Sequence, residues 1–194
     1  MKKAWIAIWM IAYLGCLPYS DHPLTESGKS RIDSSIVGTW FHKEDDESVY
    51  LHIGLDDQSK LLRLIMVEYD RDGKLKTSEF CGHTSSLNGS TYLNLKWVHP
   101  PQQEETGYMI VKFAVDQDAL GIAIMTGAVV KAAITSEALQ GKVIEGKWSS
   151  DIRISEGQKK LQRFITENDK ALFPEMIFLR KHQPKSHPMR RGDK

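Results

Sequence analysis

The sequence predicts an all-β fold: an antiparallel up-and-down barrel of about eight strands with two accessory helices. Three observations predict this fold. Short apolar runs follow one another from Ile36 onward and are separated by turn-forming residues. Hydrophobic residues alternate with polar ones within several runs, as in half-buried strands. Two dipeptides, Asp72-Gly73 and Asn88-Gly89, are favoured in the type I′ turns of β-hairpins.

Eight segments have the character of strands. Alternation is clear in the second segment, where every second residue from Val49 to Leu55 is apolar. The seventh segment is apolar on both faces, so we expect another element to cover its outer side. The predicted strands are Ile36–His42, Ser48–Leu55, Leu61–Tyr69, Lys74–Ser85, Thr91–Val98, Gly107–Val115, Ala119–Met125 and Lys142–Trp148.

Two helices and one more strand complete the predicted domain. Ala128–Leu139 is rich in alanine and is followed by Gly141. Ser155–Leu172 is the stronger helix, because Ser155 and Gln158 have the spacing of a capping box. Its apolar residues, Leu161, Phe164, Ile165 and Leu172, fall on one stripe. The last predicted strand is Met176–Arg180.

The first sixteen residues have the pattern of an export signal. Lys2-Lys3 precede an apolar run from Ala4 to Leu14, which is shorter than the roughly 20 residues of a spanning helix. With Gly15-Cys16 after it, the segment resembles a bacterial lipoprotein signal, although Tyr13 and Leu14 depart from the usual pattern before the cysteine. A plain secretory signal, giving a periplasmic or secreted protein, and an uncleaved anchor are the alternatives.

The lipoprotein resemblance implies a location and an order of domains. Residues 1–15 would be the signal peptide, and Cys16 the lipid-attachment residue that anchors the protein to a membrane. Leu17 after the cysteine implies the periplasmic face of the outer membrane. Residues 16–35 are rich in turn formers, which predicts a lipidated, flexible tether of about 25 Å. The domain then spans residues 36–181, and residues 182–194 form a basic tail, which is predicted to be disordered, with contact to anionic lipid or a peptidoglycan-associated polymer as the alternative.

Composition excludes some partners. The formal net charge of +1 gives no electrostatic reason to expect nucleic-acid binding.

The chain has two cysteines, Cys16 and Cys81. We predict a buried, inert Cys81 thiol, with a reactive Cys81–His83 pair or a Cys16–Cys81 disulfide as alternatives.

Glu68–Glu79 is the segment closest to a metal-binding motif. Five of its positions fit a calcium-binding EF-hand loop, but the first position is Glu68 rather than aspartate, and the flanks do not have a helical pattern. The segment is therefore interpreted as a hairpin that turns at Asp72-Gly73. His42, His52 and His83 show no ligand spacing, so no metal site is predicted. Without a recognisable catalytic or cofactor motif, we predict neither enzymatic activity nor a cofactor.

Gly38-Thr39-Trp40 opens the first predicted strand. This G-x-W resembles the first-strand motif of lipocalins and related calycin barrels. The order of a strand series, a helix and a final strand is also similar. The resemblance implies that a late basic residue packs on Trp40; Arg180 is the expected residue and Lys181 the alternative. The chain departs from the family in having Asp116-Gln117-Asp118 between the sixth and seventh strands and a helix at Ala128.

The fold predicts two kinds of function. A barrel of about eight strands holds one small ligand in its lumen, so the first hypothesis is a module that binds an apolar or amphipathic molecule. The alternative is an envelope structural or assembly protein with a packed barrel that acts through its surface. The identity of the ligand and any protein partners stay open.

Overall fold

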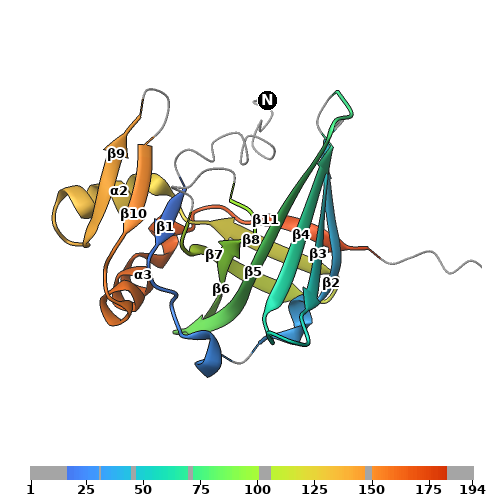
Figure 1. The fold of residues 1–194 in the computed structure, drawn as a ribbon, viewed down its shortest axis with the longest axis horizontal. Coiled ribbons are helices and arrows are strands. Elements are labelled where there is room, and N and C mark those ends of the chain that lie inside the picture. The colour runs from blue at the N-terminus through green and yellow to red at the C-terminus, as the bar shows by residue number, and fades with distance from the viewer. Residues whose placement is uncertain are drawn as a thin grey trace, which may run out of the picture.

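In the computed structural model, eight strands close into an antiparallel barrel, as predicted. The structure describes residues 17–30, 32–44, 47–69, 72–100, 106–146 and 150–182. The strands follow chain order around the barrel, and β11 closes it between β8 and β2 (Figure 1). The barrel strands are β2 (Gly38–Glu44), β3 (Glu47–Leu55), β4 (Leu62–Tyr69), β5 (Leu75–Leu87), β6 (Ser90–Trp97), β7 (Met109–Asp116), β8 (Ala119–Ile124) and β11 (Ile177–Lys181).

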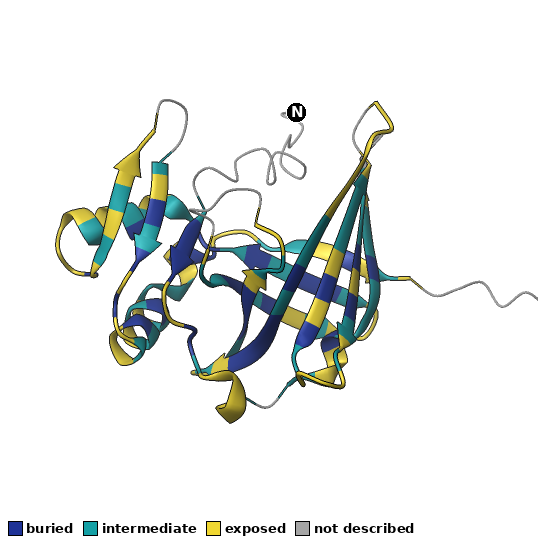
Figure 2. Ribbon diagram, viewed as in Figure 1, coloured by how far each residue is buried: buried dark blue, intermediate teal, exposed yellow. Residues whose placement is uncertain are grey.

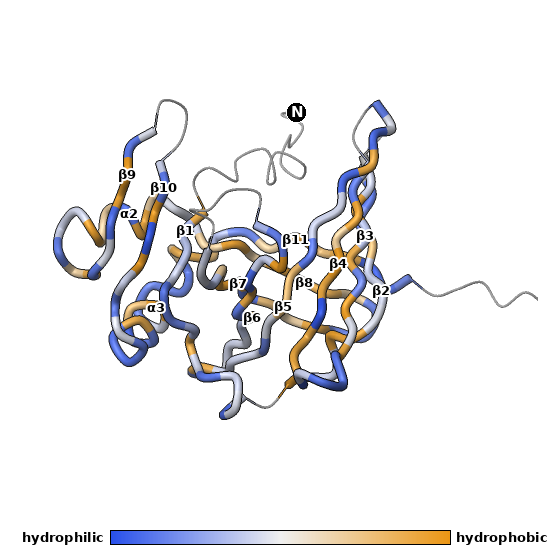
Figure 3. Tube along the Cα trace, in the orientation of Figure 1, coloured by the Kyte–Doolittle hydropathy of each residue, from blue (hydrophilic) through white to orange (hydrophobic). Residues whose placement is uncertain are grey.

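The alternation seen in the sequence sorts residues between the two faces of the barrel wall. Along β4, Leu62 and Leu64 are buried, while Arg63 and Ile65 are exposed. Figure 2 shows this change from buried to exposed along the strand, and Figure 3 shows hydrophilic residues interrupting the hydrophobic ones. The inward residues form one apolar cluster, which we call the lumen cluster; it includes Trp40, Ile53, Leu64, Leu93, Phe113 and Leu120.

A second layer covers the outer face of β6, β7 and β8. It contains α2 (Gly127–Thr135), α3 (Gln158–Leu172) and a small sheet of β1 (Pro18–Ser20), β10 (Ser150–Ile154) and β9 (Gly141–Glu145). Figure 1 shows this layer beside the barrel. Its apolar residues meet outward residues of the barrel in a second cluster, the outer core, which includes Leu24, Tyr92, Ile110, Ile154, Leu161 and Ile165.

The eighth predicted barrel strand is wrong. Residues 142–145 of the segment predicted as Lys142–Trp148 belong to β9, which pairs with β10 in the small sheet instead of closing the barrel, and residues 147 and 148 lie outside the described residues. The final strand β11 closes the barrel, pairing with β8 over four residue pairs and with β2 over two. The local pattern of β9 suits either sheet, so its pairing partner could not be predicted from that pattern.

The predicted flexible tether is replaced by folded chain over much of residues 17–30. Pro18, Tyr19 and Ser20 form β1, which pairs in parallel with β10. Leu24 is fully buried in the outer core. Two short 3₁₀ turns, η2 (Ser27–Lys29) and η3 (Ser34–Ile36), then lead into the barrel. The N-terminal segment is therefore part of the domain.

Both predicted helices form, but α3 begins later than expected. Its N-cap is Gly157, with no side-chain cap, so the capping box proposed for Ser155 and Gln158 does not form. The Gln158 amide instead donates to the Pro23 carbonyl, 3.1 Å away. Leu161, Ile165 and Leu172 are buried, as the stripe predicted. Among the described residues, no helix has the length and apolar character to cross a membrane.

Candidate functional site: an apolar cavity in the barrel

The lumen cluster does not fill the barrel. A cavity of about 170 Å³ lies inside it and is lined by inward residues of all eight barrel strands. Nearly all of the lining is apolar, and the thioethers of Met66 and Met109 contribute to it. The other apolar side chains include Val49, Leu51, Leu64, Phe80, Leu93, Leu95, Trp97, Val111, Ile122, Ile124, Ile177 and Leu179.

One end of the barrel is closed by packed side chains. Trp40 is completely buried there with Ile36, and its indole Nε1 donates a hydrogen bond to the Ile36 carbonyl at 2.8 Å. Ile36 precedes the barrel in η3, so this turn plugs the end. Leu62 and Leu120, also fully buried, complete the closed end.

The basic residue over Trp40 is Lys181, the alternative in the sequence prediction. Its ammonium nitrogen lies 5.3 Å from the centre of the indole ring, within the range of a cation–π contact. Arg180, the residue expected for this role, is exposed, because neighbouring strand residues point to opposite faces. Gly38 has a φ of +145°, and a Cβ there would meet the Lys181 chain at 3.4 Å. Glycine therefore suits both the backbone and the close approach of Lys181.

The other end, which we call the mouth end, has the polar part of the lining. His42 and Glu68 line the cavity there, each two residues beyond an inward apolar residue of its strand. The His42 Nδ1 atom lies 3.1 Å from the carbonyl oxygen of Phe178. The sequence analysis did not select either residue for the lumen, although alternation from Trp40 and Met66 would have placed both on the inner face.

The N-terminal segment also reaches the mouth end. Leu17 and Pro18 line the cavity, and the indole of Trp97 donates to the Tyr19 hydroxyl at 3.1 Å. Trp97 in turn packs on Phe80, with 4.2 Å between the ring centres. The residues predicted as a tether thus form part of the rim.

The remaining candidate residues do not join this cavity. Cys16 lies outside the described residues. Cys81 is a half-buried free thiol on the outer face. The His83 ring is buried, and its Nε2 lies 2.6 Å from the Thr25 carbonyl. Burial lowers the pKa of His83, and this hydrogen bond only partly opposes the shift.

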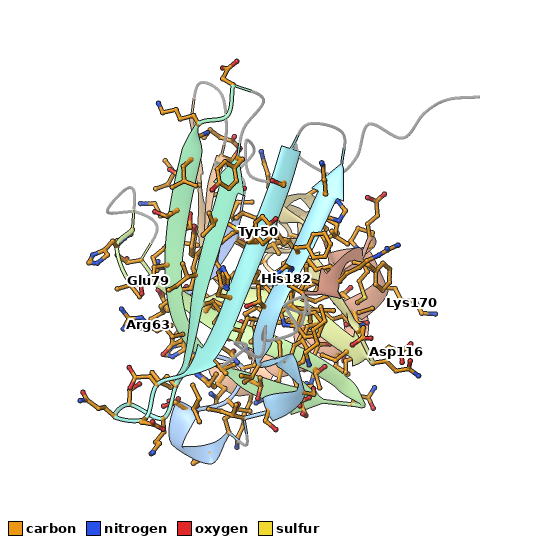
Figure 4. All side chains as sticks on the ribbon, turned by 90° about the vertical axis from the view of Figure 1, so that its right-hand side faces the viewer. Tyr50, Arg63, Glu79, Asp116, Lys170 and His182 are labelled. Carbon is orange, nitrogen blue, oxygen red and sulfur yellow. The ribbon has the colours of Figure 1, made fainter. Side chains whose placement is uncertain are left out.

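The predicted hairpin between β4 and β5 forms. Tyr69 pairs with Leu75 beside the turn, and Glu79 lies within the strand β5. The Glu79 carboxylate accepts from Arg63 at 2.6 Å, and Figure 4 shows both side chains together on the outer face. Within the described residues, no group of three or more histidine, cysteine or acidic side chains is placed to hold a metal ion.

A second cavity, of about 480 Å³ and partly polar, lies between the β5–β6 hairpin and α3. At its edge, the Asp169 carboxylate accepts from the Tyr92 hydroxyl at 2.7 Å and pairs with the Lys112 ammonium. Burial raises the pKa of Asp169, but the bonds from Lys112 and Tyr92 outweigh it and hold the pKa below its ordinary value. These groups satisfy one another and fix α3 to the barrel wall, which gives them a structural role.

The geometry suits non-covalent binding of an apolar molecule. The lumen has an apolar body, a packed floor and two ionisable side chains toward its mouth end. Comparisons with protein-family models, with curated proteins and with solved structures give no match for this chain.

Proposed function

We propose that this chain is a lipocalin-like lipoprotein, anchored to the outer membrane through Cys16, whose barrel binds a small apolar or amphipathic molecule. One observation carries the proposal: the barrel contains an apolar cavity in place of a filled core. Protein interiors are ordinarily packed about as densely as organic crystals. A cavity surrounded by strands of a closed barrel therefore has the character of a binding site.

The size of the cavity limits the ligand. Its volume of about 170 Å³ is close to that of an engineered apolar cavity, about 150 Å³, that binds benzene. The buried part of the ligand would thus be one ring or a short alkyl chain. His42 and Glu68 at the mouth end would then lie near a polar group on a ligand that extends past the cavity. An amphipathic molecule satisfies both parts of the lining.

An envelope structural or assembly role is the second candidate, and one surface feature favours it. On the outer face, the rings of Phe41 and Tyr50 stack with centres 6.1 Å apart, and His182 meets both edge-on. Figure 4 shows Tyr50 and His182 on the side of the barrel that the second layer leaves uncovered. Phe178 is also exposed. Under this reading the lumen would have no ligand.

A series of straight-chain alkanols tests the binding proposal, with affinity measured by titration calorimetry on the Cys16→Ser chain. Each buried CH₂ contributes about 0.8 kcal/mol, so the affinity should rise about fourfold per carbon until the lumen is full. Longer chains should then gain little. The chain length at which the affinity levels off measures the usable depth of the lumen.

A matched pair of variants locates the binding. Val111→Phe adds a ring inside the lumen, whereas Val67→Phe adds the same ring on the outer face, where Val67 pairs with Tyr50. We expect Val111→Phe to lose most of the alkanol affinity and Val67→Phe to keep it, with urea unfolding confirming that both fold. Equal affinity in the two variants, or no alkanol binding by the parent, would contradict the proposal and favour the second candidate.

The anchor has a separate test. If Cys16 carries lipid, full-length protein expressed in a Gram-negative host should enter the detergent phase of a Triton X-114 partition. Cys16→Ser should move the protein to the aqueous phase, and Cys81→Ser is the control that should leave it unchanged. Unaltered partitioning of Cys16→Ser would exclude lipidation at this residue.

A further inference from the structure

We infer that the mouth end of the barrel faces the bilayer that holds the Cys16 lipid, so that the ligand is a molecule dissolved in that membrane and enters the lumen from it. This inference rests on the proposed function. It adds an orientation, a route of entry and a class of ligand. Three features of the described residues support it.

The first feature is the fixed position of the chain beside Cys16. Leu17 and Pro18 line the cavity at the mouth end, and Leu17 is the residue directly after Cys16 in the sequence. Consecutive Cα atoms are about 3.8 Å apart. A lipid on Cys16 would therefore be attached at the rim of the cavity, without a long linker between membrane and barrel.

β1 holds this rim in place. It pairs with β10 along Pro18–Ser20, and Ser20 exchanges two backbone hydrogen bonds with Tyr108, of 2.9 and 2.8 Å. The bond from Trp97 to the Tyr19 hydroxyl adds a side-chain link to the lumen wall. Leu17 therefore belongs to a fixed part of the domain, and the bilayer cannot lie far from the mouth end when Cys16 is anchored.

The second feature is the β4–β5 hairpin, which projects beyond the rest of the barrel at the same end (Figure 1). Tyr69 and Leu75 are Cα partners beside its turn and are 42% and 51% exposed. Tyrosine is favoured at membrane interfaces, where its ring meets hydrocarbon and its hydroxyl meets water. Leucine on the paired strand supplies apolar surface that a bilayer would cover.

The third feature is the turn between β3 and β4 at the opposite, closed end. This turn is polar, and the Asp56 carboxylate accepts from the backbone amides of Gln58 and Ser59. Asp57 and Lys60 in this turn are strongly exposed. The β5–β6 turn at this end is Asn88-Gly89. One apolar side chain, Leu55, is also exposed at this end (47%), so the difference between the ends is that only the mouth end has an exposed Tyr–Leu pair on a projecting hairpin among the residues that the structure describes.

The charge of the mouth end indicates which kind of membrane surface it contacts. At the mouth end, Glu44 at the end of β2 pairs with Glu47 at the start of β3. A pair of acidic residues at this end is unfavourable beside anionic lipid. The surface we infer is therefore a zwitterionic one, and the experiment uses phosphatidylcholine vesicles.

Two labelled variants of the lipidated full-length protein test the orientation. With Cys81→Ser as background, Leu75→Cys at the mouth end and Asp57→Cys at the closed end each carry one environment-sensitive fluorophore. In phosphatidylcholine vesicles that contain a spin-labelled phosphatidylcholine, we expect quenching at Leu75→Cys to be several-fold greater than at Asp57→Cys. Equal quenching, or greater quenching at Asp57→Cys, overturns the inference.

The alkanol series on the Cys16→Ser chain separates this inference from the proposed function. Alkanol binding without preferential quenching at Leu75→Cys keeps the binding function and overturns the orientation. Preferential quenching without alkanol binding supports the orientation and overturns the lumen as a binding site, and with it the route of entry. Both results together support the full inference.

Discussion

The lumen cluster and the outer core lie on opposite faces of the same strands, β6, β7 and β8. Inward residues such as Leu93 and Leu95 line a cavity, whereas outward residues such as Tyr92 and Ala123 meet a second layer that covers them. The difference comes from what each face can recruit. A helix or an N-terminal segment can pack on the outside, but between its two ends the inside of the barrel is filled by the side chains of the strands.

The outer core is stabilised by hydrogen bonds between buried polar groups as well as by apolar packing. Asn94 is completely buried on the outer face of β6, and its Oδ1 accepts from the Leu24 amide at 2.6 Å. Its Nδ2 donates to the Ser85 hydroxyl at 2.7 Å. Buried polar groups with partners favour one specific arrangement. Among the residues given above for the apolar walls of the lumen, Trp97 is bonded in this way, to Tyr19 at the rim, and the walls below the rim are apolar, which leaves room for a ligand.

The largest expected effect compares the two ends of the lumen. Trp40→Ala should destabilise the protein by about 3–5 kcal/mol, because a fully buried indole and its bond to Ile36 are lost. Trp97→Ala should cost distinctly less, because Trp97 is only half-buried and already borders the cavity. Urea unfolding measures both. Equal and small losses would mean that Trp40 does not close the barrel.

The next comparison makes the same leucine-to-alanine change in the outer core and in the lumen cluster. Leu161→Ala in the outer core should cost about 3–5 kcal/mol, in the upper part of the range for buried leucine. Leu95→Ala in the lumen should cost about 2 kcal/mol, since Leu95 has fewer contacts to lose on its cavity side. The midpoint of urea unfolding measures the difference. A larger loss for Leu95→Ala would indicate that the lumen is the better-packed region.

These two regions also differ in how far the sequence predicts them. Alternation along β3 predicted a barrel strand with one apolar face, because alternation is a local, period-two pattern. The outer core depends on partners far apart in the chain. Leu24 lies in a polar segment and is fixed by Asn94, 70 residues away, so no local signal marks it as buried. The same limitation made β9 resemble a barrel strand.

The cavity was predictable in part. The resemblance to lipocalins implied a lumen, and alternation alone would have placed His42 on the inner face after Trp40. The contribution of Leu17 and Pro18 to the rim was not predictable, because it follows from the parallel pairing of β1 with β10. A three-residue strand in a segment rich in turn formers has no pattern that separates it from a linker.

A smaller effect, dependent on pH, tests the polar fastening of the N-terminal segment. Burial lowers the pKa of His83 in the folded protein, so the neutral ring is favoured. Its contribution to stability is therefore present above the unfolded pKa of about 6.5 and is lost as the pH falls through the folded value. We expect the urea midpoint to fall between pH 7 and pH 5.

Two histidine variants test whether His83 causes this dependence of the urea midpoint on pH. His83→Gln should flatten the dependence of the urea midpoint on pH, whereas His52→Gln should keep it, because His52 is an exposed residue bonded to the Thr39 hydroxyl. An unchanged slope in His83→Gln would show that burial of this ring does not govern the acid response.

The smallest expected effect distinguishes the two basic residues of β11. Lys181→Ala should lose about 0.5–1 kcal/mol, because the ammonium group over Trp40 and the part of the chain that covers Gly38 are removed. Arg180→Ala should stay within about 0.5 kcal/mol of the parent, as expected for an exposed side chain. Neither change touches the cavity lining, so alkanol affinity should be the same in both. If Arg180→Ala were the more destabilising variant, the side chain that stabilises the closed end would be that of Arg180, on the outer face of β11. The packing of Lys181 on Trp40 would then contribute nothing to stability.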